Sequence, residues 1–340
     1  MRISWAGLIL GVSLAWGWAE EPVSRIGFGS CYKPEKSSPL WRAVEDFNPQ
    51  VWLWLGDNVY ADVIDGKLIF ENLPQDAFQK AYAALGRSEG LAALKNLPAG
   101  HMMATWDDHD YGLNDAGKFW ERKENAKQEF AAFWQQPVRG DGVYFSREFG
   151  PEGRRIRVIL LDTRYNRDDP ATDGDILGEA QWSWLEEEYL RPGAALVLIG
   201  SSIQVLPESH RFEKWSNFPK AKKRLLEMLD AHGDKKLIFL SGDRHHAEIL
   251  SLSMGKGRQV FEVTSSGLTE GYDPRWTTGW AAEKGATPWR YRQAGEPRRT
   301  MPPFFGDNFG TLEIIWGPPQ PQIRAAIRRE DGSKARQIYF

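Results

Sequence analysis

The chain has 340 residues, of which 41% are hydrophobic and 26% are charged, and its formal net charge at pH 7 is -3. These values fit a folded protein of one large domain or two small ones. Because no internal repeat or low-complexity tract is visible, we predict one domain. The small negative charge gives no reason to expect nucleic acid or an anionic membrane as a stable partner.

The N-terminus has the pattern of an export signal. Arg2 supplies the positively charged n-region, residues 3–18 are apolar, and a small-x-small cleavage pattern ends at Ala19. A membrane anchor is the competing interpretation, but the stretch is short and lacks basic residues on its far side. We therefore predict a signal peptide over 1–19, and a mature chain over 20–340 that is periplasmic or secreted and not inserted in a membrane.

The first half of the chain alternates strands with helices, as apolar runs of strand length and helical periodicity indicate, and further strands and helices follow up to Asp243. The expected strands are Arg25–Ser30, Val51–Leu55, His101–Thr105, Val143–Phe149, Arg155–Asp162, Ala195–Ile199 and a run that ends before Asp243. The expected helices are Leu40–Phe47, Asp76–Leu94 with a break near Gly86, Trp120–Trp134, Gly178–Leu190 and Pro219–Ala231.

The last third is mostly strand, which predicts an α/β sheet packed on a second sheet. The expected strands there are Glu248–Met254, Val260–Ser265, Phe309–Trp316 and Ile323–Arg329. Tyr272–Pro303 has no period, so we expect either a functional lid or a poorly ordered segment.

Polar side chains follow four of the expected strands. They are Cys31, Asp57, the Asp-Asp-His at 107–109 and the Asp-x-His-His that begins at Asp243. If these strand ends converge on one edge of a sheet, they supply a set of metal ligands. Each also has a plainer interpretation, because Gly56-Asp57-Asn58 is common turn chemistry and a lone Cys31 fits an inert buried thiol.

Two metal ions about 3.5 to 4 Å apart need a bridging carboxylate together with His and Asp ligands. Asp57 is suited to the bridge. Carboxylates suit calcium, magnesium or manganese, while imidazole, thiolate and phenolate suit iron or another transition metal. The residues therefore favour an asymmetric pair of ions.

Seven motifs in consistent order resemble the PhoD-like alkaline phosphatases of the calcineurin-like metallophosphoesterase superfamily. They are GSCYKP, LGDNVYAD, ATWDDHDYG, LLDTRYNRD, LGEAQWSWLEEE, LSGDRHHAE and VTSSGLT, between Gly29 and Thr269. The resemblance implies a four-layer α/β/β/α sandwich of two mixed sheets flanked by helices. It also implies an exported phosphatase that hydrolyses phosphate monoesters, diesters or both through a metal-activated hydroxide.

The resemblance carries over to individual residues. Cys31, Tyr60 and His245 match ligands of a ferric ion, and Asp57 matches the carboxylate that bridges it to a second ion, expected to be calcium. Zinc, manganese or magnesium are alternatives. The expected remaining ligands of the second ion are Asp108, with Asp107 as its alternative in register, and Asp243.

His109 falls where the superfamily has the acid that protonates the leaving alkoxide. Other residues of the motifs are expected around the ligands or facing the substrate, and they are Asp107, Asn58, Arg164, Arg244 and His246. Arg164, with Asp162, fits an internal strut, and Arg244 faces either phosphate or solvent. The alternative functions are a phosphodiesterase that acts on diesters only and a metal-binding module without turnover. The protein is expected to be a monomer.

Overall fold

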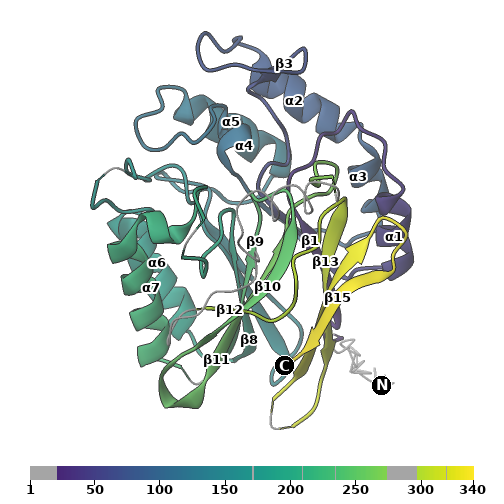
Figure 1. Ribbon diagram of the computed structural model, residues 1–340, viewed down its shortest axis with the longest axis vertical. Coiled ribbons are helices and arrows are strands. Elements are labelled where there is room, and N and C mark those ends of the chain that lie inside the picture. Colours follow the sequence, from purple (N-terminus) through teal and green to yellow (C-terminus); the bar gives the residue numbers. More distant parts are fainter. Residues whose placement is uncertain (1–20, 171, 209, 234, 274–296, 319) are drawn as a thin grey trace, which may run out of the picture.

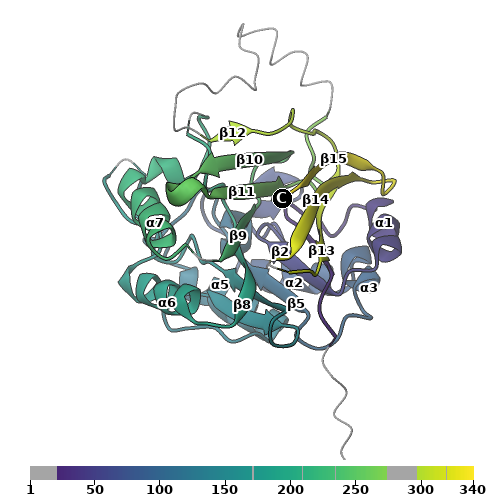
Figure 2. The same cartoon turned by 90° about the horizontal axis from the view of Figure 1, so that it is seen from below.

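The computed structural model describes residues 21–340 apart from 171, 209, 234, 274–296 and 319. Two large β-sheets stand face to face, and helices cover both outer sides (Figures 1 and 2). Within the described ranges, none of the helices combines the length and the hydropathy needed to span a bilayer. The predicted signal peptide lies outside the described residues.

The first sheet has the strand order β15-β14-β13-β1-β2-β5. Its strands β1, β2 and β5 are parallel, and β13 to β15 add an antiparallel half. The bounds are β1 Arg25–Gly29, β2 Val51–Leu55, β5 Met102–Thr105, β13 Asn308–Ile315, β14 Gln322–Arg329 and β15 Lys334–Tyr339.

The second sheet has the order β12-β10-β11-β9-β8-β7-β6, with β7, β8, β9 and β11 parallel. The bounds are β6 Phe145–Phe149, β7 Arg155–Leu160, β8 Ala194–Ser201, β9 Lys236–Ser241, β10 Ala247–Ser253, β11 Gln259–Ser265 and β12 Arg298–Arg299. A small hairpin, β3 Val63–Ile64 and β4 Lys67–Leu68, stands apart from both sheets.

Helices cover the outer side of each sheet. Helices α6 Glu179–Leu190 and α7 Pro219–Ala231 pack on the second sheet, opposite the group near the first (Figure 2). That group comprises α1 Leu40–Phe47, α2 Ala77–Gly86, α3 Glu89–Ala93, α4 Asp108–Tyr111 and α5 Lys123–Trp134. Three buried apolar clusters separate the four layers, so the predicted sandwich is confirmed.

Strand β2 shows why the central apolar run is continuous. Trp52 and Trp54 belong to the cluster beneath the helices, whereas Leu53 and Leu55 belong to the cluster between the sheets. Successive side chains of a strand point to opposite faces, and here both faces are covered. Strand β2 is therefore fixed on both of its faces, and this fixes the position of the segment that follows it.

Most predicted elements are present within a few residues of their expected bounds, but several features differ. The acidic loop after β5 contains the short helix α4. Strand β15 was not predicted, and Arg298–Arg299 forms β12 inside the range 272–303, of which 274–296 lies outside the described residues. The four polar strand ends come from two sheets and not from one edge, because β9 belongs to the second sheet.

Candidate metal centre

The turn after β2 brings Asp57 toward the second sheet. Gly56 has φ +95°, and a Cβ there would lie 2.6 Å from the Asp107 Cβ and 3.0 Å from the Ser202 Cβ. Only glycine allows this close approach together with that backbone conformation. The turn thus needs Gly56 so that Asp57 can follow directly.

Four of the predicted ligands have left-handed backbone conformations. The φ angles are 59° for Cys31, 48° for Asp57, 69° for Asp243 and 52° for His245. Positive φ is uncommon outside glycine, and such residues persist where the surrounding structure fixes them, often at functional sites. The strand ends are therefore shaped to present these side chains.

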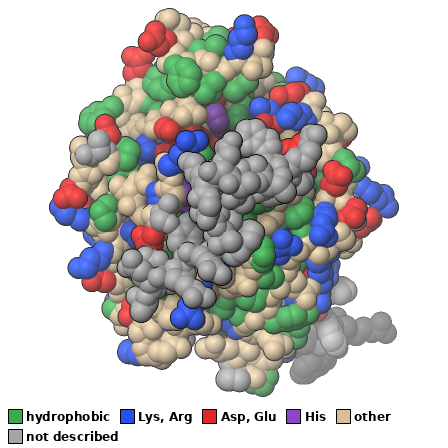
Figure 3. All heavy atoms as spheres, in the orientation of Figure 1, with side chains coloured by type: hydrophobic (Ala, Val, Ile, Leu, Met, Phe, Trp, Pro, Cys, Tyr) green, Lys and Arg blue, Asp and Glu red, His purple; other side chains and the backbone are tan. Residues whose placement is uncertain are grey.

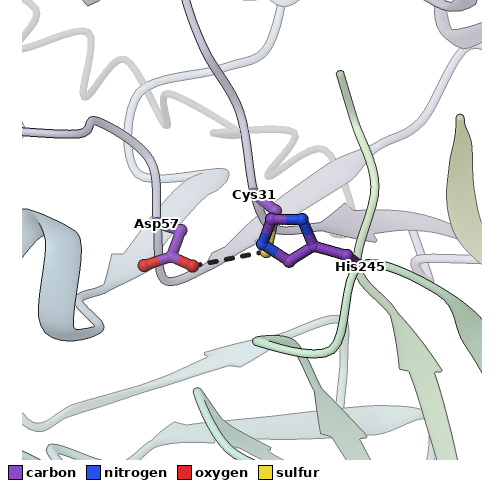
Figure 4. A group of neighbouring side chains, drawn as sticks. All are labelled: Cys31, Asp57 and His245. Carbon is purple, nitrogen blue, oxygen red and sulfur yellow. Dashed lines mark hydrogen bonds between the residues drawn. The ribbon is translucent and has the colours of Figure 1, made fainter. Parts of the chain in front are cut away.

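The first donor group joins the two sheets. Ligand atoms of Cys31, Asp57 and His245 all lie within 4.8 Å of one another (Figure 4). The Cys31 thiol donates to Asp57 Oδ2 at 3.3 Å and lies 3.0 Å from the Ser266 Oγ. The structure therefore brings together one predicted ligand from each of three separate segments.

The second donor group shares Asp57 with the first. Ligand atoms of Asp57, Asp108 and His109 also lie within 4.8 Å of one another. Asp62 fixes the orientation of the His109 ring, because His109 Nδ1 donates to the Asp62 carboxylate at 2.8 Å. Asp57 is thus the carboxylate common to both groups, as predicted for a bridge.

Tyr60 lies beside both groups. Its ring contacts that of His109 in a tilted arrangement, with a centroid distance of 4.2 Å and an interplanar angle of 31°. Burial, followed by the charges of Cys31 and Asp57, raises the pKa of its phenol well above the ordinary value. Its hydroxyl is buried and has no hydrogen-bond partner among the described residues. Tyr60 thus lies near Cys31, Asp57 and His109, and its role as a phenolate ligand stays a prediction.

Asp243 lines the same pocket as Asp57, Asp108 and His109, which has a volume of about 580 Å³. It does not join a group of three donor atoms among the described residues. Its Oδ2 is buried without a hydrogen-bond partner. The structure therefore places Asp243 at the pocket but brings its carboxylate less close than the other predicted ligands.

Burial makes anionic donors costly in this pocket. It raises the pKa of the Cys31 thiol to about 12, and burial together with Cys31 raises the pKa of Asp57 well above its usual range. Burial also raises the pKa of Asp243. Bound cations would reverse these shifts, because a metal ion favours the deprotonated form of its ligands.

At His109 the neighbouring charges outweigh the effect of burial on the pKa. Burial by itself would lower its pKa, but the charges of Asp108, Asp57 and Asp62 outweigh burial and raise that pKa well above the ordinary value. Burial likewise opposes ionisation of Asp108, yet His109 and Arg164 lower its pKa. In the metal-free protein the charges around this pair therefore favour imidazolium beside carboxylate, the charge state expected of a general acid.

Asp107, the alternative in register, has its Oδ1 engaged by other side chains, whereas its Oδ2 is buried without a hydrogen-bond partner among the described residues. Its Oδ1 accepts from Arg164, and it accepts from the Ser202 hydroxyl at 2.9 Å. Arg164 is fully buried and also pairs with Glu213. The geometry thus favours Asp108 over Asp107 as a ligand and makes Arg164 the strut that the sequence suggested.

Two other residues of the motifs support the site without pointing donors into it. Asn58 donates to the Thr105 carbonyl and to Asp110, which fixes the start of α4 against the turn after β2. His246 Nδ1 lies 2.8 Å from the Arg244 carbonyl, and its ring stacks on Phe305. His246 therefore steadies the loop that carries His245.

Sequence reasoning missed three acidic residues near the pocket. Asp62 orients His109, and a third donor group joins Asp108 with Asp115 and Glu213. Asp62 and Asp115 lie within or just after motifs that were recognised, so their carboxylates were visible signals. Glu213 stands in a segment without a pattern, and only the fold brings it near Asp108.

The donor set fits metal ions. Three predicted ligands have a buried oxygen without a hydrogen-bond partner among the described residues, namely Asp57 Oδ1, Tyr60 Oη and Asp243 Oδ2, and so do the neighbouring Asn58 Oδ1 and Asp107 Oδ2. Leaving such an atom unpaired costs about 1 to 3 kcal/mol, which a bound cation would remove. Figure 3 shows histidine at the surface beside acidic and basic side chains, which agrees with a pocket lining of all three types.

Comparisons with known proteins identify the family. A family model described as PhoD-like phosphatase matches residues 27–313, which is most of the chain. The chain belongs to the PhoD-like phosphatase family. It is therefore a phosphoric ester hydrolase with a phosphate ester as substrate, and the resemblance of its motifs is confirmed. No curated protein matches the sequence.

Two solved structures share the fold. The structure of PhoD has a TM-score of 0.63 and 17% identity, over 94% of this chain and 72% of its own. The structure of GAP50, the anchor in the inner membrane complex of Plasmodium, has a TM-score of 0.51 and 11% identity, over 94% of this chain and 88% of its own. At these identities the likeness concerns the fold alone.

Proposed function

We propose that this protein is an exported, metal-dependent phosphatase that hydrolyses phosphate monoesters, diesters or both at the pocket around Asp57. The observation that carries the proposal is that Asp57 is shared between the donors Cys31 and His245 on one side and, on the other, the donor Asp108 with the proposed acid His109 beside it. Two such groups in one pocket match the needs of a two-ion site.

In this proposal each set of donor side chains favours a different kind of metal ion. Cys31, Tyr60 and His245 offer thiolate, phenolate and imidazole, which suit Fe³⁺, with Asp57 as the shared ligand. Asp108 and Asp243 offer hard oxygens to the second ion, for which Ca²⁺ is proposed and Zn²⁺, Mn²⁺ or Mg²⁺ are alternatives. When bound, such ions lower the pKa of water and neutralise charge on phosphoryl oxygens.

The residues around the donors supply the proton and hold it in place. His109 Nδ1 is engaged by Asp62, so its Nε2 is the atom left to donate to the leaving alkoxide. The raised pKa of His109 keeps that proton available at alkaline pH. We propose His109 as the general acid and Asp62 as the residue that orients it.

The structure of GAP50 is a reason to test turnover directly, because that protein has the same fold and is described as an anchor. The alternatives are hydrolysis of diesters only and a metal-binding module without turnover. The test is to incubate purified protein with 4-nitrophenyl phosphate and bis(4-nitrophenyl) phosphate and to measure bound metals. Release of nitrophenolate from either ester supports the phosphatase, while loaded protein that cleaves neither contradicts it.

We propose that residues 20–340 act as one catalytic domain after removal of the signal peptide over 1–19. The apolar stretch and the small-x-small pattern at Ala19 support this. N-terminal sequencing of protein from the periplasm or medium tests it, because an intact leader there would contradict cleavage. We also propose a monomer, which sedimentation equilibrium tests.

A further inference from the structure

Arg244 is a buried cation at the wall of the pocket. It lies between Asp243 and His245, and its side chain is only 8% exposed. Its guanidinium lies over the ring of Phe212 at 4.0 Å from the centroid. An aromatic face attracts a guanidinium, so Phe212 holds Arg244 in one place.

Among the described residues, no side chain forms a close hydrogen bond with the guanidinium of Arg244. Its Nε is buried without a partner among the described residues, and its Nη1 lies 4.0 Å from Asp243 Oδ2, which is longer than a hydrogen bond. By contrast, Arg164 and Arg167 both donate to Glu213. Burying a charged group without hydrogen bonds is costly, so this arrangement indicates that an anion completes it.

Phe212 is itself fixed in position. Glu213, its neighbour in the chain, pairs with both Arg164 and Arg167. Two residues later Trp215 Nε1 donates to the Ser201 hydroxyl at 3.0 Å. The ring that carries Arg244 is therefore anchored to the same buried network that holds Asp107, and it does not depend on a free loop.

Arg244 shares its pocket with the proposed metal ligands Asp57, Asp108 and Asp243. Lys214 is close enough that its pKa is lowered by burial and by the charge of Arg244. Positive charge from Arg244, with Lys214 nearby, therefore lies beside the proposed metal donors. A ligand that touches both Arg244 and these donors would carry its negative charge on several oxygens.

We propose that Arg244, held on the ring of Phe212, binds a terminal oxygen of the reacting phosphoryl group and thereby favours phosphomonoesters over phosphodiesters. The proposal rests on the proposed phosphatase function. A monoester dianion has two charges on three terminal oxygens, whereas a diester has one charge on two. A guanidinium forms strong charge-assisted hydrogen bonds to such oxygens, so it stabilises the monoester more.

The test compares kcat/KM for 4-nitrophenyl phosphate and bis(4-nitrophenyl) phosphate in wild type and Arg244→Gln. We expect a loss of ~10- to 100-fold for the monoester, the range of a hydrogen bond to a charged group, and a clearly smaller loss for the diester. Arg224→Gln is the matched control, because Arg224 lies over the Trp182 ring at 4.6 Å outside this pocket. Equal losses for both esters, or no loss, would overturn the proposal.

A binding measurement separates this proposal from the proposed function. Titration with inorganic phosphate in a calorimeter should show ~10- to 100-fold weaker binding to Arg244→Gln at unchanged metal content. If the wild type cleaves neither ester, the phosphatase proposal fails, yet this titration still decides the role of Arg244. Unchanged phosphate affinity in Arg244→Gln, absent phosphate binding in the wild type, or metal loss in the variant would each refute that role.

Phe212→Leu tests whether the ring positions the guanidinium. The variant keeps the charge of Arg244 but removes the aromatic face. The kcat/KM for the monoester should therefore fall less than in Arg244→Gln, and the kcat/KM for the diester should again fall less than that for the monoester. A fall that is equal for both esters would instead assign Phe212 to the shape of the pocket.

Discussion

Asp57 is the residue on which both donor groups depend. It is buried, its backbone is left-handed, and one of its carboxylate oxygens has no hydrogen-bond partner among the described residues. These features have a common explanation if the carboxylate faces cations, because a buried anion is otherwise unfavourable. The single charge of this side chain should therefore decide whether metals are retained.

Asp57→Asn should lower hydrolysis by at least ~10³-fold and release at least one metal ion, since the amide has the same shape without the charge. The measurements are kcat/KM and metal content by elemental analysis. Asp65→Asn is the matched control, because Asp65 has a similar φ of 49° but is exposed in the hairpin turn. Full activity with unchanged metal content in Asp57→Asn would contradict the two-ion site.

His109→Ala should keep both ions yet lose about 10²- to 10⁴-fold in rate, the range for one positioned acid or base. The loss should be largest for alkyl phosphates and small for 4-nitrophenyl phosphate, because nitrophenolate leaves without a proton. Comparing the two leaving groups checks this. Equal losses, or loss of a metal, would assign His109 to binding or ligation.

Asp62→Asn should shift the alkaline limb of the kcat/KM profile to lower pH. Burial lowers the pKa of His109, and Asp108, Asp57 and Asp62 together raise it above the ordinary value. Removing the charge of Asp62 lowers that pKa, so the proton needed by the leaving group is lost at lower pH. An unshifted limb, measured with an alkyl phosphate, would show that His109 does not supply this proton.

At the scale of elements, the site depends on close contact between the ends of strands from different sheets. Gly56 follows β2 where a Cβ would meet Asp107 and Ser202. The backbone N–H of Gly242, after β9, donates to the Ser202 carbonyl at 3.0 Å. These short turns bring the residues after β2, β8 and β9 together. Small changes of the backbone there should therefore displace the proposed ligands.

Gly56→Ala should destabilise the protein by more than the ~1 to 3 kcal/mol expected for a strained backbone and should also lower activity. The reason is that the added Cβ both strains φ and clashes with Asp107. Gly66→Ala is the control, because Gly66 has φ +74° but nothing within 4 Å of an added Cβ. Chemical denaturation and kcat/KM check this, and equal effects of the two substitutions would refute the role of the close approach.

At the scale of the whole molecule, the metal-free protein should lose stability as pH rises. Burial raises the folded-state pKa of Asp57 and Asp243 above the unfolded values. Such groups contribute stability below the unfolded pKa near 4, and that contribution is lost as pH rises through the folded pKa. Bound cations remove this loss, because they stabilise the charged carboxylates.

Removal of metal by a chelator should therefore abolish hydrolysis and lower Tm by more at pH 9 than at pH 5. If Cys31 and Tyr60 bind a ferric ion, chelation should also bleach a visible charge-transfer band. Thermal unfolding, activity and absorbance are followed together, with readdition of single metals as the control. A colourless, iron-free protein with full activity would remove Cys31 and Tyr60 from the proposed iron site.

The sequence predicted local features well because they depend on neighbours in the chain. The apolar run of β2, the turn at Asp57 and the polar strand ends with Cys31 and His245 follow from periodicity and turn chemistry, whereas Tyr60 and the roles of the single ligands needed the family resemblance. The contacts of Asp62, Glu213 and Phe212 could not be predicted, because they join segments with no shared pattern. The choice of Asp108 over Asp107 became clear only when Arg164 was seen to hold Asp107.

The donor group of Cys31, Asp57 and His245 has a consequence for how the protein matures. The first two residues belong to the first fifth of the chain, and the third arrives only with the segment after β9. A chain that lacks the segment after β9 cannot assemble this group. Any ion that needs all three donors can therefore bind only after the fold has joined both sheets, so the proposed metal content should depend on the ions present where folding is completed.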